Sequence, residues 1–354
     1  MKIKLAILEK DVSYLNRIVS VFSTKYADNF EIYSFTEEDT MYASLENNKI
    51  DVLAASDVFD IDISKLPKRC GFAYLVDTSG IETVRDQQAI CKFQKAEQIY
   101  KQILSVFSDK TDSLSAFSAH SDNDTDVCIF SSVSGGSGAS VMAVAAARYF
   151  AAQGKKTLYL NLEKFGNSDV FFSADGQYNF SDVIFSLKSK KSNLALKLES
   201  CVKCDKSGVY FYSQTQSALD MIEVTSEESI RLISELKGSA IYDYIIVDCD
   251  FSIKSDFLDV CRKAHSWIWV GDGSQISNDK VVKAYKALTI IENNQEFPLT
   301  SRIGIIYNKF SKATCQTITD VQINMIGGSP RFEHASVSQI VDQLSVSEMF
   351  NKIF

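Results

Sequence analysis

The stretch that most constrains the fold of this chain is SSVSGGSGASVMAVAAARYF, residues 131–150. It places Gly135, Gly136 and Gly138 between an apolar run, VCIFSSV, and an alanine-rich segment. Glycines let the backbone turn tightly with its N–H groups pointing inward, and a helix that follows presents its positive end to an anion. The stretch therefore predicts a phosphate-binding loop between a buried strand and a helix, and we expect this helix to stop at Gly154.

The phosphate-binding lysine is missing from this loop. The usual G-x-x-x-x-G-K-[ST] pattern ends in a lysine and a hydroxyl residue, and these two positions hold Ala139 and Ser140 here. Backbone amides and the helix end bind phosphate without any side chain, so we expect nucleotide binding to survive. A missing charged contact to the transferring phosphoryl group typically costs ~10³ to 10⁵ in rate, so we expect slow hydrolysis or none.

Apolar strand-like runs alternate with helix-like segments along the chain, which is typical of parallel sheets covered by helices. One series holds IKLAIL, IDVLAAS and FAYLVD, and the second runs from VCIFSSV through YDYIIVDCD to RIGIIYNKF. Residues 108–126 are rich in Ser and Asp and predict a linker. We therefore predict an α/β fold class with two doubly wound parallel-sheet domains, residues 1–107 and 127–354.

The net charge, the cysteines and the lengths of the apolar runs limit which partners and which compartment are expected for this chain. With a net charge of -8 over 354 residues, the chain has no general attraction to DNA or anionic lipid, and no nucleic-acid partner is expected. Its eight scattered cysteines suit reduced thiols in the cytoplasm, and Cys201 and Cys204 form only half of a zinc-knuckle pattern. No apolar run is long enough to cross a bilayer, and we expect MKIKLAILEKD to be a first strand, not a signal peptide.

Taken together, these motifs resemble the deviant Walker ATPases of the ParA/MinD superfamily, whose loop reads x-K-G-G-x-G-K-[ST]. G-A-S in place of G-K-[ST] is most similar to the TadZ/CpaE branch, proteins of Tad (Flp, type IV) pilus assembly. That branch also places a receiver-like domain before the ATPase domain, so the resemblance covers nearly the whole chain. The lysine that in relatives reaches the partner's nucleotide across a dimer aligns with Ser134.

The resemblance implies ATP and Mg²⁺ as cofactors and assigns the site residue by residue. ATP would contact Ser134, Gly135, Gly136, Ser137, Gly138, Ala139, Ser140 and Val141 of the loop, Asn308 of IIYNKF at the adenine, and Pro330 of SPRFEH beside the base. Mg²⁺ would lie between Ser140 and Asp248 of YDYIIVDCD. In the Asp-x-Asp element of relatives the second acid orients the attacking water; this chain has Asn161 and Glu163 there, so Glu163 is the candidate catalytic residue.

The first domain resembles the receiver domains of bacterial response regulators, which have a flavodoxin-like fold. Receivers hold Mg²⁺ beside a phosphorylatable aspartate at the end of the third strand, and Ser56 has that place here, with Asp57 one residue later. A register shift of one residue would make Asp57 the acceptor. Only Glu9 and Asp11 are acidic at the end of the first strand, and Lys92 takes the place of the receiver lysine. The incomplete set predicts protein docking without phosphotransfer.

Near the C-terminus, Val337, Ile340, Val341 and Leu344 have helical spacing. Some relatives end in a membrane-binding amphipathic helix, but few basic residues accompany this one, so core packing is predicted.

Two function classes stay open. The first is an ATP-binding localisation protein whose Mg-ATP-promoted homodimer hydrolyses ATP weakly or not at all, and whose receiver-like domain docks onto pilus-assembly or polar-localisation proteins. It would be cytoplasmic, at the cell pole or peripheral to the inner membrane through its partners. The alternative is a nucleotide-free pseudo-ATPase scaffold. A basic residue from elsewhere, for example Lys309 or Arg331, stays open as a replacement for the missing lysines.

Overall fold

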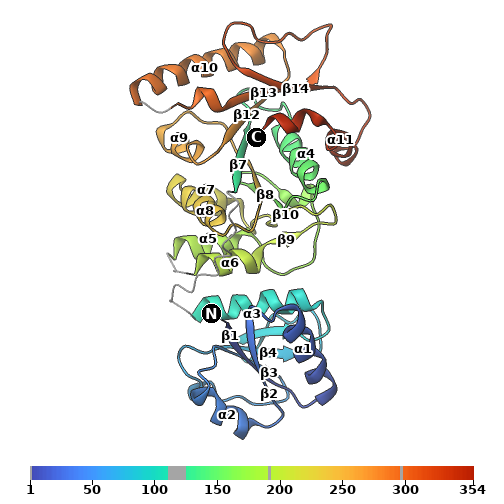
Figure 1. Ribbon diagram of the computed structural model, residues 1–354, viewed down its shortest axis with the longest axis vertical. Helices are drawn as coiled ribbons and strands as arrows, with labels where there is room; N and C mark the ends of the chain where they lie inside the picture. The colour runs from blue at the N-terminus through green and yellow to red at the C-terminus, as the bar shows by residue number, and fades with distance from the viewer. Residues whose placement is uncertain (1, 111–124, 190–192, 296–297) are drawn as a thin grey trace. The chain divides into compact units, whose positions relative to one another are not determined.

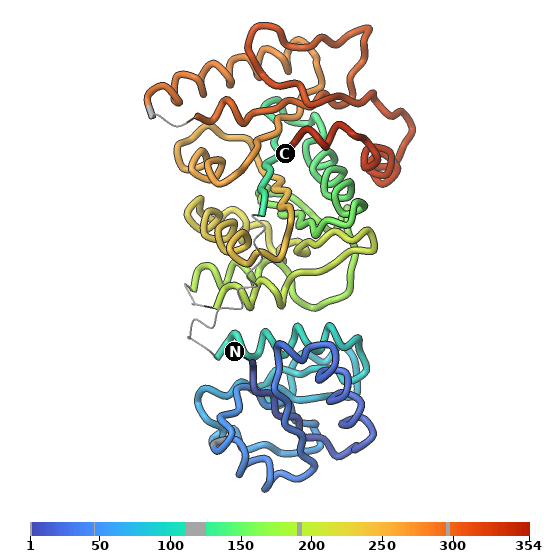
Figure 2. Tube along the Cα trace, viewed as in Figure 1, coloured from blue at the N-terminus to red at the C-terminus, as the bar shows by residue number. Residues whose placement is uncertain are grey.

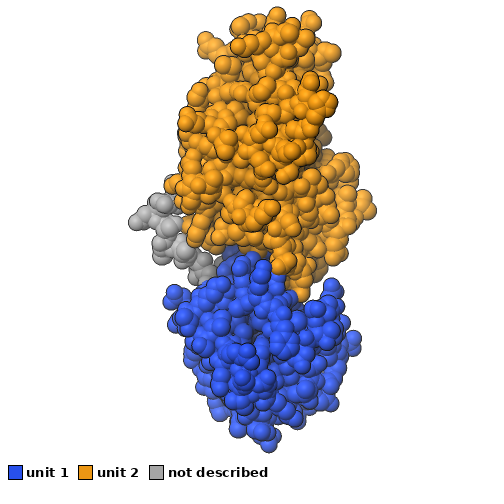
Figure 3. All heavy atoms as spheres, turned by 90° about the vertical axis from the view of Figure 1, so that its right-hand side faces the viewer, with its two compact units in different colours: residues 1–117, 189–201 blue, residues 118–188, 202–354 orange. Residues whose placement is uncertain are grey.

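The computed structural model describes residues 2–110, 125–189, 193–295 and 298–354. The chain divides into two compact units (Figure 3). Unit 1 comprises residues 1–117 and 189–201, and unit 2 comprises residues 118–188 and 202–354. Most of the predicted linker, residues 111–124, lies outside the described residues. The domain boundaries drawn from the sequence therefore stay a prediction.

Unit 1 is built on a six-stranded sheet in the order β2-β1-β3-β4-β6-β5 (Figure 1). Every strand pair is parallel except β5 with β6. Its strands are β1 (Ile3–Leu8), β2 (Phe30–Phe35), β3 (Val52–Ser56), β4 (Gly71–Val76), β5 (Thr83–Val84) and β6 (Gln87–Cys91). Its helices are α1 (Val12–Lys25), α2 (Glu38–Asn47), α3 (Ala96–Lys110) and α6 (Leu194–Cys201), with the 3₁₀ turn η1 (Ile63–Lys65). The order 2-1-3-4 is that of flavodoxin-like domains.

The core of unit 1 explains its strand sequences. Helices α1 and α3 pack on one face of the sheet and α2 packs on the other. Strands β3 and β4 are therefore buried on both faces, which is why they read as continuous apolar runs. Helix α1 begins after Asp11, whose carboxylate accepts the N–H groups of Ser13 and Tyr14, and buries Leu15, Ile18 and Phe22.

Unit 2 is built on an eight-stranded sheet in the order β14-β13-β12-β7-β11-β8-β10-β9 (Figure 1). Every pair is parallel except β9 with β10. Its strands are β7 (Asp126–Ser131), β8 (Thr157–Asn161), β9 (Lys203–Cys204), β10 (Tyr210–Phe211), β11 (Tyr244–Asp248), β12 (Ser266–Gly271), β13 (Ile303–Phe310) and β14 (Asn324–Pro330). Its α-helices are α4 (Ala139–Ala152), α5 (Phe180–Lys188), α7 (Ala218–Ile222), α8 (Ser226–Gly238), α9 (Ser255–Cys261), α10 (Gln275–Gln295) and α11 (Val337–Leu344). Its 3₁₀ turns are η2 (Ser168–Val170), η3 (Thr300–Arg302) and η4 (Glu348–Lys352).

Helix α4 follows the central strand β7 and packs in the core of unit 2. It stops as predicted: Gly154 has a φ of 79°, and the N–H of Lys155 donates to the carbonyl of Phe150, 3.2 Å away. The C-terminal segment, red in Figure 2, runs beside α4, and α11 buries Val341 and Leu344 in the same core. The predicted core packing is confirmed for Val341 and Leu344, and Ile340 packs against the same core, whereas Val337 is 44% exposed.

A membrane-spanning helix is not found in the part of the chain that the structure describes, because no helix there combines the needed length with the needed apolar content.

Candidate functional site

The glycine-rich loop lies between β7 and α4, at the carboxyl end of the central strand of unit 2. Gly135, Gly136 and Gly138 have φ values of 71°, 65° and 90°, in the left-handed region that glycine adopts most readily. At Gly138 the backbone also passes close to Asn308, since a Cβ there would lie 2.5 Å from the Asn308 Nδ2. The loop thus has the tight, glycine-dependent path that phosphate-binding loops require.

The first turn of α4 opens directly from this loop. Gly138 is the N-cap residue and has no side chain with which to cap the helix. The N–H groups of the first turn, which includes Ala139, Ser140 and Val141, therefore have no side-chain partner from the N-cap, and they carry the positive end of the helix dipole. This is the arrangement that binds anions at helix N-termini.

Two strands bring acids to the loop. Strand β11 pairs with β7 on one side and β8 on the other, so their carboxyl ends meet beside the start of α4. Asp248 ends β11 and is fully buried. Glu163 follows β8, and its Oε2 accepts a hydrogen bond from the Ser140 hydroxyl at 3.1 Å. The structure therefore places three predicted residues, Ser140, Glu163 and Asp248, in one cluster.

Burial dominates the electrostatics of this cluster. Burial and, after it, the nearby Glu163 carboxylate raise the pKa of Asp248, the hydroxyls of Tyr159 and Ser140 oppose the shift, and the net result is a pKa of about 8. Burial also raises the pKa of Glu163, against the hydrogen bond from Ser140. Two carboxylates held this close in a buried place favour a cation between them.

The cluster fits Mg²⁺. Oδ1 of Asp248 is buried and has no hydrogen-bond partner, and the nearby donor atoms are the oxygens of Ser140 and Glu163, the ligand type that Mg²⁺ prefers. Across the described ranges no group of three or more His, Cys, Asp or Glu side chains has the geometry of a metal site. A cation here would therefore need phosphate oxygens and water to complete its six ligands, as Mg²⁺ in nucleotide sites does.

Sequence reasoning missed Tyr159. Its hydroxyl donates to Asp248 Oδ2 at 2.7 Å and accepts from Asn161 Nδ2 at 3.3 Å. Asn161 in turn accepts the Glu163 N–H at 2.9 Å, so the residue in the place of the first acid shapes the turn that carries Glu163. The sequence contains only part of this signal: Tyr159 and Asn161 are two residues apart and share a face of β8, but the bond to Asp248 depends on the pairing of β8 with β11.

The other side of the loop is held by serines. The hydroxyl of Ser137, which is buried, donates to the carbonyl of Val270 at 2.7 Å. The hydroxyls of Ser134 and Ser277 lie 3.0 Å apart, which ties the loop to the first turn of α10. Ser134, the position of the signature lysine in the resemblance, is therefore bonded within its own chain.

The predicted adenine residues lie on neighbouring strands. Asn308 of β13 is buried, donates to the Ser137 carbonyl at 2.8 Å and accepts from the Ser329 hydroxyl at 2.9 Å. Pro330 ends β14 and lines a cavity of about 420 Å³ together with Tyr307 and other residues of both strands. Because the Asn308 amide already joins the loop to β13 and β14, its contact with adenine stays a prediction.

Lys309, the residue after Asn308, also reaches the loop. Its Nζ donates to the carbonyl of Gly136 at 2.9 Å. Arg331, the other basic residue considered from the sequence, is exposed just after β14.

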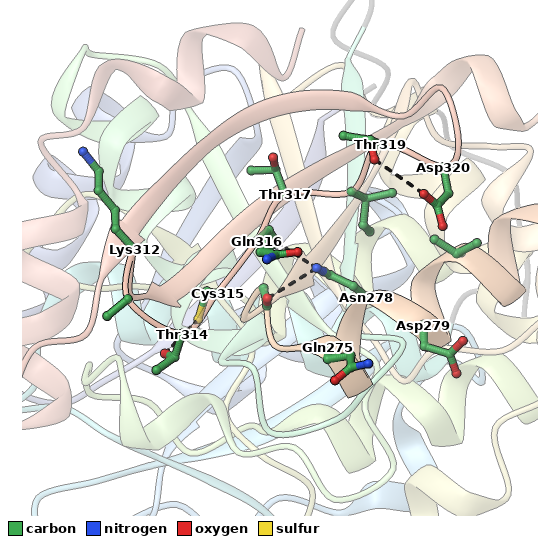
Figure 4. Close-up of a pocket in the computed structure, with 14 residues that line it drawn as sticks. Gln275, Asn278, Asp279, Lys312, Thr314, Cys315, Gln316, Thr317, Thr319 and Asp320 are labelled. Carbon is green, nitrogen blue, oxygen red and sulfur yellow. Dashed lines mark hydrogen bonds between the residues drawn. The ribbon is translucent and has the colours of Figure 1, made fainter.

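A second cavity, of about 650 Å³, lies between α10 and residues 312–320 (Figure 4). Asn278 of α10 lines this cavity, and its Nδ2 donates to the carbonyls of Gly273 and Gln316, at 3.3 and 2.7 Å. No residue predicted from the sequence lines it.

In unit 1 two of the predicted receiver positions, Glu9 and Ser56, meet around Lys92, whereas the Asp11 carboxylate caps α1. The Lys92 Nζ lies 2.7 Å from Glu9 Oε2, 2.9 Å from Asp77 Oδ1 and 3.3 Å from the Ser56 hydroxyl. Ser56 ends β3 and is fully buried, whereas Asp57 follows the strand and is half-buried. Asp77 was not singled out from the sequence, although it directly follows the apolar run of β4. One ammonium group thus serves as the counter-charge for both acids of this pocket.

The family model described as TadZ-like, receiver domain, matches residues 1–108. No curated protein matches the chain. Among solved structures, a ParA family ATPase from Chlorobium tepidum is 21% identical, with a TM-score of 0.48, over 66% of this chain and 96% of that chain. A chain of the MinC:MinD cell division protein complex of Aquifex aeolicus is similar at 17% identity, with a TM-score of 0.49, over 65% of this chain and 94% of that chain. The septum site-determining protein MinD of Pyrococcus horikoshii, solved with Mg-ADP, is similar at 16% identity, TM-score 0.47, over 62% and 94%.

Both predicted folds are confirmed. The parallel sheet of unit 1 in the order 2-1-3-4 has the predicted flavodoxin-like arrangement, and residues 1–108 match the TadZ-like receiver domain model. The strand order of unit 2 and its glycine-rich loop between β7 and α4 give it the doubly wound P-loop fold.

Proposed function

We propose that this chain is an ATP-binding localisation and assembly protein of the TadZ/CpaE type, which forms a Mg-ATP-promoted dimer and hydrolyses ATP weakly or not at all. The observation that carries the proposal is the left-handed glycine loop that opens directly onto α4 beside Ser140 and Asp248. Loops of this shape bind phosphate through backbone amides and the helix end.

In this proposal residues 134–141 hold the phosphates, and Ser140 and Asp248 hold Mg²⁺, the latter through water. When bound, the cation supplies positive charge that offsets the phosphates and the buried carboxylates. In the same proposal the base contacts Asn308, near the end of β13, and Pro330, at the end of β14.

Slow hydrolysis follows from the side chains present. Ala139 and Ser134 replace both lysines of the resembling family, and Ser134 is bonded to Ser277. Glu163, the proposed water-orienting residue, carries a raised pKa and is bonded to Ser140. We therefore assign the nucleotide a structural role in assembly.

Exposed apolar side chains around the loop support the proposal that a second copy of the chain packs on this face. Large apolar side chains follow three strands at the same sheet edge: Phe165 after β8, Ile253 after β11 and Ile276 after β12, of which Phe165 is 80% exposed and Ile276 72%. Exposed apolar groups gathered near one site favour protein contact. Unit 1, in whose pocket Lys92 is the counter-charge for both acids, would then dock onto pilus-assembly or polar proteins in the cytoplasm.

The alternative is a nucleotide-free scaffold, and one observation favours it. The Asn308 amide is bonded to Ser137 and Ser329, so the residue assigned to adenine is already satisfied within the protein.

Light scattering of the full chain with Mg-ATP, with Mg-ADP and without nucleotide tests the proposal. We expect ATP to favour the dimer more than ADP does, with a coupling free energy of ~1 to 3 kcal/mol between ATP binding and dimerisation. Phosphate release should stay slow. Phe165→Ser should weaken the dimer and leave the nucleotide affinity of the monomer unchanged. A mass that is the same under all three conditions would favour the scaffold.

A further inference from the structure

We infer that Lys309 of β13 supplies the phosphate-binding positive charge that the loop lacks. The inference rests on the proposed function, because it concerns the same nucleotide site. It assigns to Lys309 a contact with the phosphate groups of the ligand, in place of the lysines replaced by Ala139 and Ser134.

The backbone of β13 directs two consecutive side chains to one loop. Successive residues of a strand normally point to opposite faces of the sheet. Here the pairing with β14 shifts register between Tyr307 and Phe310, and Lys309 has a φ of 60°. As a result Asn308 contacts the Ser137 carbonyl and Lys309 contacts the Gly136 carbonyl. Strand irregularities of this kind redirect side chains next to functional sites.

The conformation of Lys309 is unfavourable for a lysine on its own. A side chain with a Cβ is uncommon at positive φ, and such strain persists where the surroundings impose it, most often at ligand sites. Strand pairing alone does not require it, because a residue in the extended conformation would continue β13. The strained residue is therefore best explained by what its side chain does at the loop.

The ammonium group is placed for a ligand on the loop. Its Nζ lies 2.9 Å from the carbonyl of Gly136, and its Cε is 4.0 Å from where a Cβ on Gly138 would be. An ammonium carries three N–H donors, and the contact with Gly136 uses one of them.

The charge balance of the site calls for such a cation. Residues 131–147 contain no lysine or arginine, so the loop contributes no positive side chain of its own. Glu163 and Asp248 lie beside it, and each would repel a phosphate in its ionised form. A lysine from a neighbouring strand offsets this repulsion without belonging to the loop sequence.

Calorimetric titration of the full chain with Mg-ADP and Mg-ATP tests the inference in matched variants. Lys309→Gln removes the charge but keeps an N–H donor that can bond to the Gly136 carbonyl, and Lys309→Arg keeps the charge. Lys286→Gln, at an exposed lysine of α10, is the control for net charge. We expect Lys309→Gln to lower the affinity for both nucleotides about tenfold or more. The affinities of Lys309→Arg and Lys286→Gln should stay within about twofold of wild type.

A rescue experiment separates charge from loop structure. Adding Ala139→Lys to Lys309→Gln should restore affinity, because it returns a positive charge to the usual position. Wild-type affinity in Lys309→Gln would overturn the inference and leave the proposed function standing. The inference would also be overturned if Lys309→Arg loses affinity as Lys309→Gln does, Ala139→Lys restores none of it, and the unfolding temperature falls. That result would assign Lys309 to loop structure. Absence of binding in wild type would overturn both proposals.

Discussion

The hydroxyl of Tyr159 donates a 2.7 Å hydrogen bond to Oδ2 of Asp248, between neighbouring buried positions of β8 and β11. The bond fixes one carboxylate oxygen and leaves Oδ1 with no hydrogen-bond partner. Burial keeps the pKa of Tyr159 well above its usual value, so this hydroxyl remains a donor across the working pH range. Asp248 is thus held in one orientation at a cost in solvation, which is typical of a group kept for a ligand.

Replacing Asp248 by Asn should make the nucleotide-free protein more stable than wild type, and this difference should grow as pH rises. The pKa of Asp248 is raised from 3.8 to about 8, so folding favours its protonated form. The stability that this proton contributes is present below about pH 4 and is lost as pH rises through about 8. Asn stays neutral and still accepts the Tyr159 bond. We expect the free energy of unfolding of Asp248→Asn to exceed that of wild type by several kcal/mol at pH 9, since each unit of difference in pKa corresponds to about 1.4 kcal/mol.

Urea unfolding in the presence of a chelator, at several pH values from 5 to 9, measures this difference. The gain should shrink as pH falls toward 5. A difference that does not change with pH would mean that Asp248 does not titrate in this range.

Ser140→Ala should weaken nucleotide binding mainly when Mg²⁺ is present. The Ser140 hydroxyl lies in the oxygen cluster proposed to hold the cation and contacts Glu163. Titration with ATP in Mg²⁺ and in a chelator separates the two conditions, and Asp248→Ala should behave in the same way. Equal losses in both conditions would assign these residues to packing of the loop.

Unit 1 should take no phosphate. The acceptor place at the end of β3 is Ser56, and Lys92 occupies the pocket together with Glu9 and Asp77. Incubation with a small phosphodonor and Mg²⁺, followed by intact-mass measurement, should show no stable addition. A mass gain that Asp57→Asn abolishes would show instead that Asp57 is the acceptor.

Lys92→Met should destabilise unit 1. Glu9 is 2% exposed, and removing its partner leaves a buried carboxylate without a counter-charge, which typically costs ~3 to 5 kcal/mol. Adding Glu9→Gln should recover part of the loss, because the pair is then removed as a whole. Thermal unfolding of the two variants checks this. A single-variant loss below about 1 kcal/mol would mean that solvent already reaches the pair.

The strands that were predicted are those that the core buries on both faces. VCIFSSV, YDYIIVDCD and RIGIIYNKF form β7, β11 and β13, where continuous apolar runs leave little ambiguity. Strands β2 and β14 were missed because each is at a sheet edge and partly exposed, so its pattern is weaker. The residues of the glycine-rich loop were predicted because their motif depends only on spacing within one short stretch of sequence.

Contacts set by tertiary structure were not predictable in the same way. The bond from Tyr159 to Asp248 depends on β8 pairing with β11, and the contact from Lys309 to Gly136 depends on a break in β13 register. Lys309 was one of two basic residues considered, and its backbone conformation and its contact with Gly136 distinguish it from Arg331. Local sequence carries little information about such a conformation outside glycine and asparagine.

Calorimetric titration of the full wild-type chain with Mg-ATP tests the central claim most directly, namely that a phosphate loop without either lysine still binds nucleotide. We predict saturable binding of one Mg-ATP per chain, weakened when Mg²⁺ is chelated. The absence of any saturable heat, in protein whose cooperative unfolding shows that it is folded, would contradict the claim.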